Sequence, residues 1–204
     1  YEINDDELDE AQNRQFCDWL RDTVPQYDVV IVLDYGHGLM TKEAIDVVCE
    51  NAKFLAVNTQ SNSGNRGFNT ISRYPRADYV CLAVHEIALE ERNRQGDLEE
   101  MILNVSRKLD CERVVVTRSK DGNLCYRKEE GFVSAPALAD KVIDRMGAGD
   151  SVISITSLCA AQGAPMEIIG FIGNVVGAQA VSTMAHRTSV EKTPLFQHIK
   201  ALIK

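Results

Sequence analysis

The residues whose types and spacing best suit chemistry are Gly147, Ala148, Gly149 and Asp150, within the stretch DRMGAGDS. They precede a segment rich in small and apolar residues that is typical of a helix. The first amides of a helix lack partners within it and carry partial positive charge, and glycines let an anion approach them. The stretch therefore predicts an anion hole for a phosphoryl group, with Asp150 accepting the proton of an attacking hydroxyl. The same four residues also fit a tight turn with an ordinary helix cap.

Polar residues at the ends of expected strands are the next candidates. Asp34 closes one strand beside Gly36, and Asn58 closes the next. Ligands of open α/β sheets bind at this edge, so Asp34 and Asn58 are candidate contacts for substrate or phosphate, with plain turns as the alternative. Glu86 begins a helix and is a candidate to organise Mg²⁺ through water, or a simple first-turn acid. We interpret His37 as a polar loop residue rather than a ligand.

The elements that must position these residues follow from hydrophobic patterns. Continuous β-branched runs predict buried strands, and two of them joined by a helix make a parallel βαβ unit. The fold class is therefore α/β, with strands first and helices toward the end of the chain. Strands are expected over 27–36, 53–58, 77–84 and 113–119, a hairpin over 120–136, a loop over 59–69, and helices over 5–23, 42–52, 85–92, 97–109, 149–162, 166–186 and 192–203.

Composition excludes several classes of function. A net charge of −8 argues against a protein that binds nucleic acid or an anionic membrane. Six scattered cysteines without a CxxC pair predict reduced, buried thiols, as in a cytoplasmic protein, and no zinc site. No apolar run is long enough to span a membrane. The N-terminal stretch is no signal peptide and begins abruptly, so we expect it to lie inside a longer sequence.

Three stretches in order resemble the PfkB (ribokinase-like) sugar kinases. They are DVVIVLDYGHGLMT, RVVVTRSKDG and IDRMGAGDSVISITSLCAAQGAPMEIIGFIGNVVGAQAV. The similarity runs from about residue 28 to the end of the chain, and it is strongest to the heptose-phosphate kinase domain of ADP-heptose synthesis. The resemblance implies a three-layer α/β/α fold with a mainly parallel central sheet. It also implies phosphorylation of a sugar or sugar-phosphate hydroxyl with ATP and Mg²⁺.

The resemblance also assigns roles by motif position. It gives Asp150 the role of general base and the 147–149 amides that of the anion hole. The branch often joins this kinase domain to a nucleotidyltransferase domain, which we expect as a fused partner. Nucleotide contacts are expected from Thr117, Arg118, Ser119, Gly122 and Asn174, the last of these near the adenine.

The chain departs from the family pattern at several points. The magnesium-linked Asn-x-x-Glu motif aligns with AVHE, so that Glu86 is kept but Ala83 replaces the Asn. His37 stands where the branch has lysine, and Arg145 and Met146 precede the GAGD stretch. From the resemblance, we expect the family's N-terminal sugar-binding part and lid to be missing from these 204 residues. We therefore expect a single domain over residues 1–204 that corresponds to the C-terminal two-thirds of the family fold, with exposed sheet edges that favour a homodimer.

Three hypotheses for function remain open from the sequence. The first is the catalytic part of a sugar kinase, with Asp150 as base. The second is a degraded kinase-like module that binds nucleotide or sugar phosphate and regulates a fused nucleotidyltransferase, which the change at Ala83 favours. The third is a scaffold, against which the retained GAGD stretch argues. We favour the first.

Overall fold

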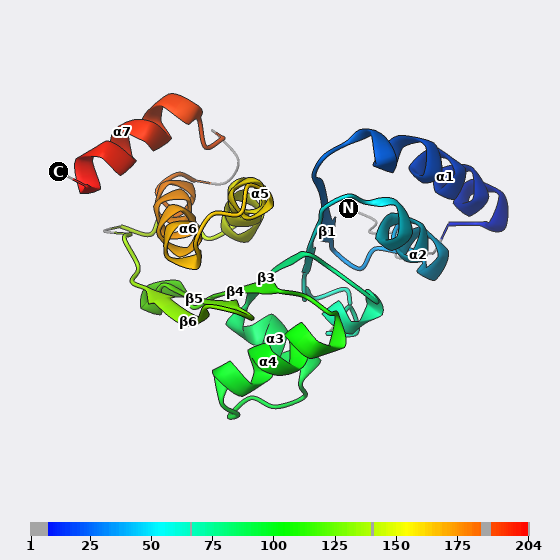
Figure 1. Ribbon diagram of the computed structural model, residues 1–204, viewed down its shortest axis with the longest axis horizontal. Coiled ribbons are helices and arrows are strands. Elements are labelled where there is room, and N and C mark those ends of the chain that lie inside the picture. The colour runs from blue at the N-terminus through cyan, green and yellow to red at the C-terminus, as the bar shows by residue number, and fades with distance from the viewer. Residues whose placement is uncertain (1–7, 66, 140, 185–188, 204) are drawn as a thin grey trace. The chain divides into compact units, whose positions relative to one another are not determined.

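The computed structural model describes residues 8–65, 67–139, 141–184 and 189–203. The chain divides into two units, Tyr1–Val114 and Val115–Lys204, which are described in turn. Figure 1 labels their elements.

The first unit begins with helix α1 (Glu10–Thr23), followed by the strand β1 (Val30–Asp34). The rest of it is built from repeated strand–helix steps. These comprise α2 (Lys42–Asn51), β2 (Leu55–Thr59), β3 (Tyr79–Ala83), α3 (Val84–Glu90), α4 (Leu98–Lys108) and the start of β4 (Arg113–Thr117), with 3₁₀ turns at Val24–Gln26 and Ile71–Arg73.

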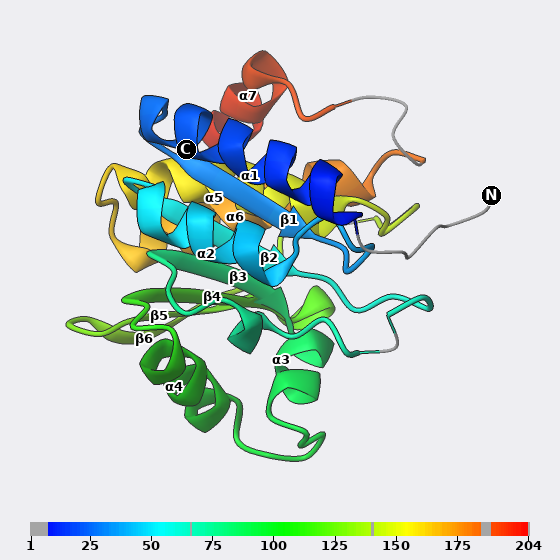
Figure 2. The same ribbon diagram turned by 90° about the vertical axis from the view of Figure 1, so that its right-hand side faces the viewer.

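Strands β1, β2 and β3 run parallel, with Val30 opposite Leu55 and Val57 opposite Val80. All five residues of β2 are buried, which explains why its sequence is a continuous apolar run rather than an alternating one. In Figure 2, α1 and α2 lie side by side in front of β1 and β2. Because the three strands run in the same direction, their carboxyl ends lie at one edge of the sheet.

Local capping fixes where the helices of this unit begin. The Asp9 carboxylate accepts the Gln12 N–H at 2.8 Å, and the Asp9 N–H donates to the Gln12 side chain in return. Thr41 accepts the Ala44 N–H at 3.2 Å and starts α2, as its sequence position predicts. Because Asp9 caps it, α1 begins at Glu10, and residues 5–7 of the expected helix lie outside the described residues.

The second unit joins a hairpin to three helices. It contains the end of β4, a 3₁₀ turn at Ser119–Asp121, β5 (Asn123–Arg127), β6 (Gly131–Ala135), α5 (Ala148–Ala161), α6 (Met166–Val181) and α7 (Lys192–Leu202). Strands β5 and β6 are antiparallel, with Asn123 opposite Ala135, and α6 packs against both and against α5. The 3₁₀ turn delays the hairpin to Asn123 from the expected residue 120.

Some expectations need correction. Trp19 of α1 is 56% exposed, although it is large and apolar, and it stacks on Phe16. Helix α6 ends at Val181 rather than at 186, and residues 185–188 lie outside the described part of the chain. Within the described residues, no helix has the length and apolar character needed to cross a membrane.

Candidate active site

The GAGD stretch forms the start of α5. Gly147 adopts a left-handed conformation, with φ of 72°, and serves as the N-cap, which leaves Asp150 as the third residue of the helix. Among the described residues, no side chain caps this helix start. A Cβ atom placed on Gly149 would meet nothing within 4 Å, so the backbone there is open to approach. The Ala148 N–H makes only a long bond, 3.3 Å, to the Arg145 carbonyl.

Hydroxyl groups hold the first turn of α5 in place. Ser151 donates its hydroxyl to the Gly147 carbonyl at 2.9 Å, and Ser154 donates to the Asp150 carbonyl at 2.6 Å. These two bonds engage carbonyl oxygens of the first turn and none of its amides. The local geometry is therefore that of an anion-accepting helix N-terminus with a carboxylate on its first turn.

The predicted nucleotide segment forms a tight loop between β4 and β5. The Arg118 N–H donates to the Gly122 carbonyl at 2.7 Å, and the Arg118 guanidinium reaches the Asp121 carbonyl at 2.9 Å and the Ser134 hydroxyl at 2.8 Å. Thr117 is half-buried at the end of β4, and the neighbouring Ser119 is exposed. The guanidinium thus links the loop to β6.

Gly122 and Asn174 meet at the end of β6. The Asn174 amide donates to the Ala135 carbonyl at 2.9 Å. Gly122 has φ of +75°, and a Cβ atom on it would lie 2.0 Å from that same carbonyl oxygen. The structure therefore brings three predicted nucleotide residues, Arg118, Gly122 and Asn174, onto Ser134 and Ala135, which the sequence did not single out.

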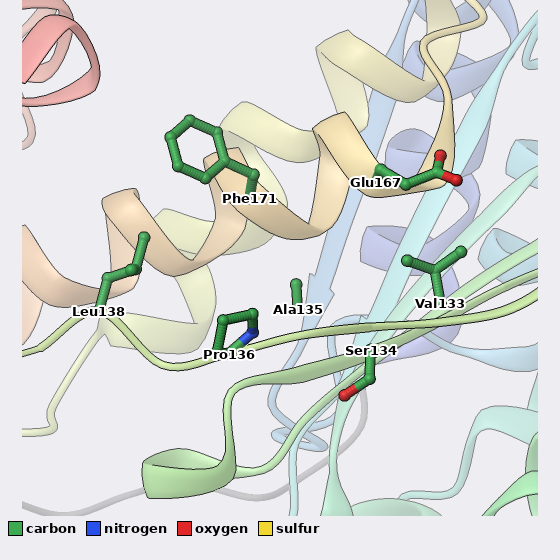
Figure 3. A pocket seen from close by; sticks show the side chains of 7 residues that line it. All are labelled: Val133, Ser134, Ala135, Pro136, Leu138, Glu167 and Phe171. Carbon is green, nitrogen blue, oxygen red and sulfur yellow. The ribbon is translucent and has the colours of Figure 1, made fainter. Parts of the chain in front are cut away.

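A cavity lies between β6 and α6, beside this cluster. Its volume is about 200 Å³, and its walls are mainly apolar. Figure 3 shows the Phe171 and Leu138 side chains near the end of the segment that follows β6, with Glu167 at the other end of the cavity. The cavity is lined by Val133, Ser134, Ala135, Pro136, Leu138, Glu167 and Phe171.

In the first unit, Asp34 is the centre of a buried hydrogen-bond network. Its carboxylate accepts the Gly36 N–H at 2.9 Å, the Tyr74 hydroxyl at 2.9 Å and the Asn69 amide at 3.3 Å. Arg73 forms an ion pair with it at 3.2 Å. Burial and the adjacent carboxylate raise the pKa of Tyr74, which keeps its proton available for donation. The carboxylate thus fixes the segment that follows β2, and a direct contact of Asp34 with substrate stays a prediction.

Asn58 and Glu86 meet at the ends of β2 and β3. The Glu86 carboxylate accepts the Ala83 N–H at 2.7 Å. Burial raises the pKa of Glu86, and the neighbouring Ala83 N–H, His85, Ser61 N–H and Asn58 amide oppose the rise. Asn58 is 6% exposed, and its Nδ2 donates to the Cys81 carbonyl at 2.8 Å. Its Oδ1 is buried without a hydrogen-bond partner.

The Asn58–Glu86 pair fits a hydrated magnesium ion. Mg²⁺ prefers oxygen ligands and keeps several of its waters, which donate hydrogen bonds to nearby acceptors. A carboxylate beside an unpartnered amide oxygen offers such acceptors. No cluster of three or more His, Cys, Asp or Glu side chains suited to a metal occurs among the described residues.

Sequence reasoning missed the partners of the predicted residues. Asn69, Arg73 and Tyr74 are 35 to 40 positions from Asp34, and no spacing rule connects them. The proximity of Asn58 and Glu86 could have been predicted from the sequence, since neighbouring parallel strands end side by side.

Comparisons with known proteins place this geometry in a family. A family model described as the pfkB family carbohydrate kinase matches residues 6–193. The bifunctional protein HldE of Citrifermentans bemidjiense is 28% identical over 181 residues, which cover 87% of this chain and 37% of that protein. The HldE protein of Desulfatibacillum aliphaticivorans is 27% identical over 189 residues, with 89% and 37% covered. This chain thus spans 37% of the length of either relative.

Solved structures show the same fold at low identity. A variant of phosphofructokinase-2 from Escherichia coli gives a TM-score of 0.77 at 15% sequence identity. The match covers 97% of this chain and 64% of the phosphofructokinase chain. Arabidopsis thaliana ribokinase, complexed with ribose and ATP, gives 0.73 at 12% identity, with 88% and 58% covered. These similarities confirm the expected fold class, a three-layer ribokinase-like α/β/α fold with a mainly parallel sheet. Since the family model matches most of its length, the chain belongs to the pfkB family of carbohydrate kinases.

Proposed function

We propose that this chain carries the phosphoryl-transfer part of a kinase that phosphorylates a sugar or sugar phosphate, similar to heptose-phosphate kinases. The observation that carries the proposal is the start of α5, where a left-handed Gly147 and an open Gly149 precede Asp150. In this proposal the amides of residues 147–149 bind the transferring phosphoryl group, because a helix N-terminus favours anions. Asp150 accepts the proton of the attacking sugar hydroxyl.

The nucleotide lies, in this proposal, along the cluster at the end of β6. Arg118, Gly122 and Asn174 contact this strand end, and Thr117 and Ser119 belong to the same loop as the first two. The neighbouring cavity of about 200 Å³ is smaller than a typical whole-ligand site, so it suits one apolar part of a ligand, such as a base.

Glu86 and Asn58 hold the magnesium ion through its waters in this scheme, since their unused acceptors fit a hydrated cation. When bound with ATP, Mg²⁺ supplies positive charge that balances the phosphate oxygens during transfer. Asp34 keeps the neighbouring segment in place rather than acting on the phosphate, because its carboxylate is engaged by Arg73 and Tyr74.

The test is a comparison of the parent chain with Asp150→Asn. Calorimetry measures MgATP binding, and a coupled assay measures transfer to a panel of sugars and sugar phosphates. We expect both proteins to bind MgATP, and transfer by Asp150→Asn to fall about 10²–10⁴-fold, the usual contribution of a general base.

Glu100→Gln is the matched control, because Glu100 is the third residue of α4 as Asp150 is of α5. It should leave transfer unchanged. Equal transfer by the parent chain and Asp150→Asn would overturn the role of the base.

A second candidate function is a regulatory module that binds nucleotide or sugar phosphate without turnover. Ala83, in place of the motif Asn, favours it. Binding of MgATP without transfer, in the parent chain and in a protein that joins it to its neighbouring domains, would support this second function. Since the similar HldE proteins are bifunctional, we propose a fused nucleotidyltransferase as the regulated partner and the cytoplasm as the location.

A further inference from the structure

Polar contacts hold helix α6 against the β5–β6 hairpin on both sides of their closest approach. That approach is at Gly170, where an added Cβ atom would lie 2.9 Å from the Cβ atom of Ala135. One turn later in α6, the Asn174 amide donates to the Ala135 carbonyl at 2.9 Å. One turn earlier, the Met166 N–H donates to a carboxylate oxygen of Glu130 at 3.3 Å. The helix is therefore held on both sides of the segment that forms one wall of the cavity.

Glu130 supplies a cap that α6 does not provide for itself. The N-cap of this helix is Pro165, whose side chain makes no hydrogen bond there. The first amides of a helix have no partner within the helix, so they need acceptors from elsewhere. Glu130 comes from the turn between β5 and β6, 36 positions before Met166, and accepts the first of these amides. The helix dipole also favours a carboxylate at this end.

Arg127 fixes the other side of the Glu130 carboxylate. The Arg127 Nη1 atom lies 2.5 Å from the carboxylate oxygen that Met166 does not use. The Glu130 N–H also donates to the Arg127 carbonyl at 3.1 Å, which closes the turn. Because both of its oxygens are bound, the carboxylate has one orientation. It can therefore couple the position of the hairpin turn to that of α6.

We propose that Glu130 is a positioning residue for the nucleotide: by holding the first turn of α6 to the hairpin, its carboxylate sets the tilt of α6 about Gly170 and so the width of the cavity. The inference rests on the proposed function, in which this cavity receives the base. Figure 3 shows Glu167 and Phe171 on the wall formed by α6, with β6 facing them. Without the Glu130 contact, the end of this wall at Glu167 can move, while Asn174 still holds the other end.

Glu130 should act on the base of the nucleotide and not on its phosphates. The hydrogen bonds of its carboxylate, to Arg127 and Met166, involve neither the GAGD stretch nor the loop over 117–122. A purely structural role would lower the stability of the hairpin and affect all ligands alike. A positioning role instead weakens binding of a ligand that fills the cavity and spares one that occupies only the anion hole.

The first experiment compares MgATP with magnesium tripolyphosphate, which has the phosphates of the nucleotide but no base. Calorimetry measures both affinities for the full chain. Glu130→Ala should weaken MgATP binding about fivefold, equivalent to the roughly 1 kcal/mol that a helix cap contributes, and leave tripolyphosphate binding unchanged. Glu130→Gln keeps an oxygen that accepts the Met166 N–H, so it should bind MgATP within about twofold of the parent, since a neutral bond is weaker than a charge-assisted one.

Two variants of the same turn are the controls. Gly131→Ala strains the turn without reaching α6, because a Cβ atom there would meet nothing within 4 Å. It should lose stability in thermal unfolding and keep its affinity for MgATP. Glu129→Ala removes the same charge from an exposed neighbour, whose side chain makes no hydrogen bond or ion pair in the described part of the chain. It should match the parent in both measurements.

The second experiment follows the position of α6 through Cys125. An added Cβ atom on Gly170 would lie 2.9 Å from the buried Cys125 Sγ atom, so access to this thiol reports a separation of the helix from the hairpin. Glu130→Ala should speed alkylation of Cys125, measured by mass spectrometry, about fivefold, because loss of the cap raises the population of the open form. Saturating MgATP should slow the reaction in the parent, because a ligand stabilises the form that binds it.

Four outcomes would overturn the inference. They are equal MgATP affinity of Glu130→Ala and the parent, an equal loss of MgATP and tripolyphosphate binding, an equal loss of MgATP affinity in Gly131→Ala, and unchanged alkylation of Cys125 in Glu130→Ala. If any of these occurred while Asp150-dependent phosphoryl transfer persisted, the kinase function would stand and Glu130 would be only a helix cap. Failure of the parent chain to bind MgATP would instead overturn the proposed nucleotide site, and this inference with it.

Discussion

At the scale of single residues, Asp34 illustrates how a candidate site residue can serve the protein itself. It is 2% exposed and receives hydrogen bonds from groups as far along the chain as Tyr74. Burying a carboxylate without such donors would be strongly disfavoured, so its partners offset the free-energy cost of its burial. The loss in free energy of unfolding when its charge is removed therefore measures how strongly Asp34 stabilises the segment after β2.

Asp34→Asn should destabilise the chain by roughly 1.5–3 kcal/mol, because it removes the buried charge that accepts hydrogen bonds from Tyr74 and from the partly exposed Arg73. Urea denaturation monitored by circular dichroism measures the free energy of unfolding. The control is Asp28→Asn, whose exposed ion pair with Lys53 should contribute less than about 1 kcal/mol. Similar losses in the two variants would show that the Asp34 network carries no special weight.

Gly147 and Gly163 allow strain and function to be separated, because they flank the same helix, α5, and both have φ of 72°. Alanine in this conformation costs about 1–2 kcal/mol, so Gly147→Ala and Gly163→Ala should lose similar stability by thermal unfolding. Only Gly147→Ala should also weaken MgATP binding, measured by calorimetry. Equal binding by both variants would remove the start of α5 from the nucleotide site.

At the scale of elements, the loop before the β5–β6 hairpin approaches the end of β6 so closely at Gly122 that no side chain fits there. A Cβ atom on Gly122 would lie 2.0 Å from the Ala135 oxygen, and this oxygen belongs to the backbone, so it cannot rotate away as a side chain could. Gly131, in the turn of the same hairpin, has φ of +77° but meets nothing within 4 Å.

Gly131→Ala should therefore cost only the strain of the left-handed conformation, about 1–2 kcal/mol. Gly122→Ala adds a backbone clash and should cost more than about 4 kcal/mol, in the range of severe substitutions. Chemical denaturation of both variants under the same conditions tests this difference. A Gly122→Ala variant as stable as Gly131→Ala would show that the loop can move away from β6.

Much of the element pattern was predictable from the sequence, because buried parallel strands read as continuous apolar runs and helices begin at recognisable caps such as Thr41. The end of β4 was less predictable. Ser119 has a positive φ, 57°, which is uncommon for serine, and the resulting 3₁₀ turn moved the start of the hairpin. The candidate site residues could be named from their motifs. Their hydrogen-bond partners could not, since contacts such as that of Arg118 with Ser134 depend on how the chain folds.

At the scale of the whole molecule, the six cysteines are free thiols, as their scattered positions predict. Cys17, Cys49, Cys81, Cys111 and Cys125 are buried, whereas Cys159 is half-buried. Burial raises the pKa of Cys111 and of Cys125 to about 12, so neither forms a thiolate near neutral pH.

A thiol titration at pH 8 should therefore detect about one fast-reacting cysteine in the folded chain, at Cys159, and all six in denaturant. Mass spectrometry after brief alkylation identifies the modified residue. Rapid modification of Cys125 would show that the hairpin opens away from α6 in solution, because its Sγ atom lies where a side chain on Gly170 would stand.

The glycines of α6 suggest a different way to judge related chains. A Cβ atom on Gly170 would lie 2.9 Å from both Ala135 Cβ and Cys125 Sγ, and one on Gly173 would lie 2.9 Å from the Asn123 amide. Because neither glycine has a side chain, α6 can pack close to β5 and β6, and this close packing sets the distance between Asn174 and the end of β6. When related chains are compared, a bulky residue in place of either glycine should predict the loss of nucleotide binding. It should do so as reliably as a substitution of Asn174 itself.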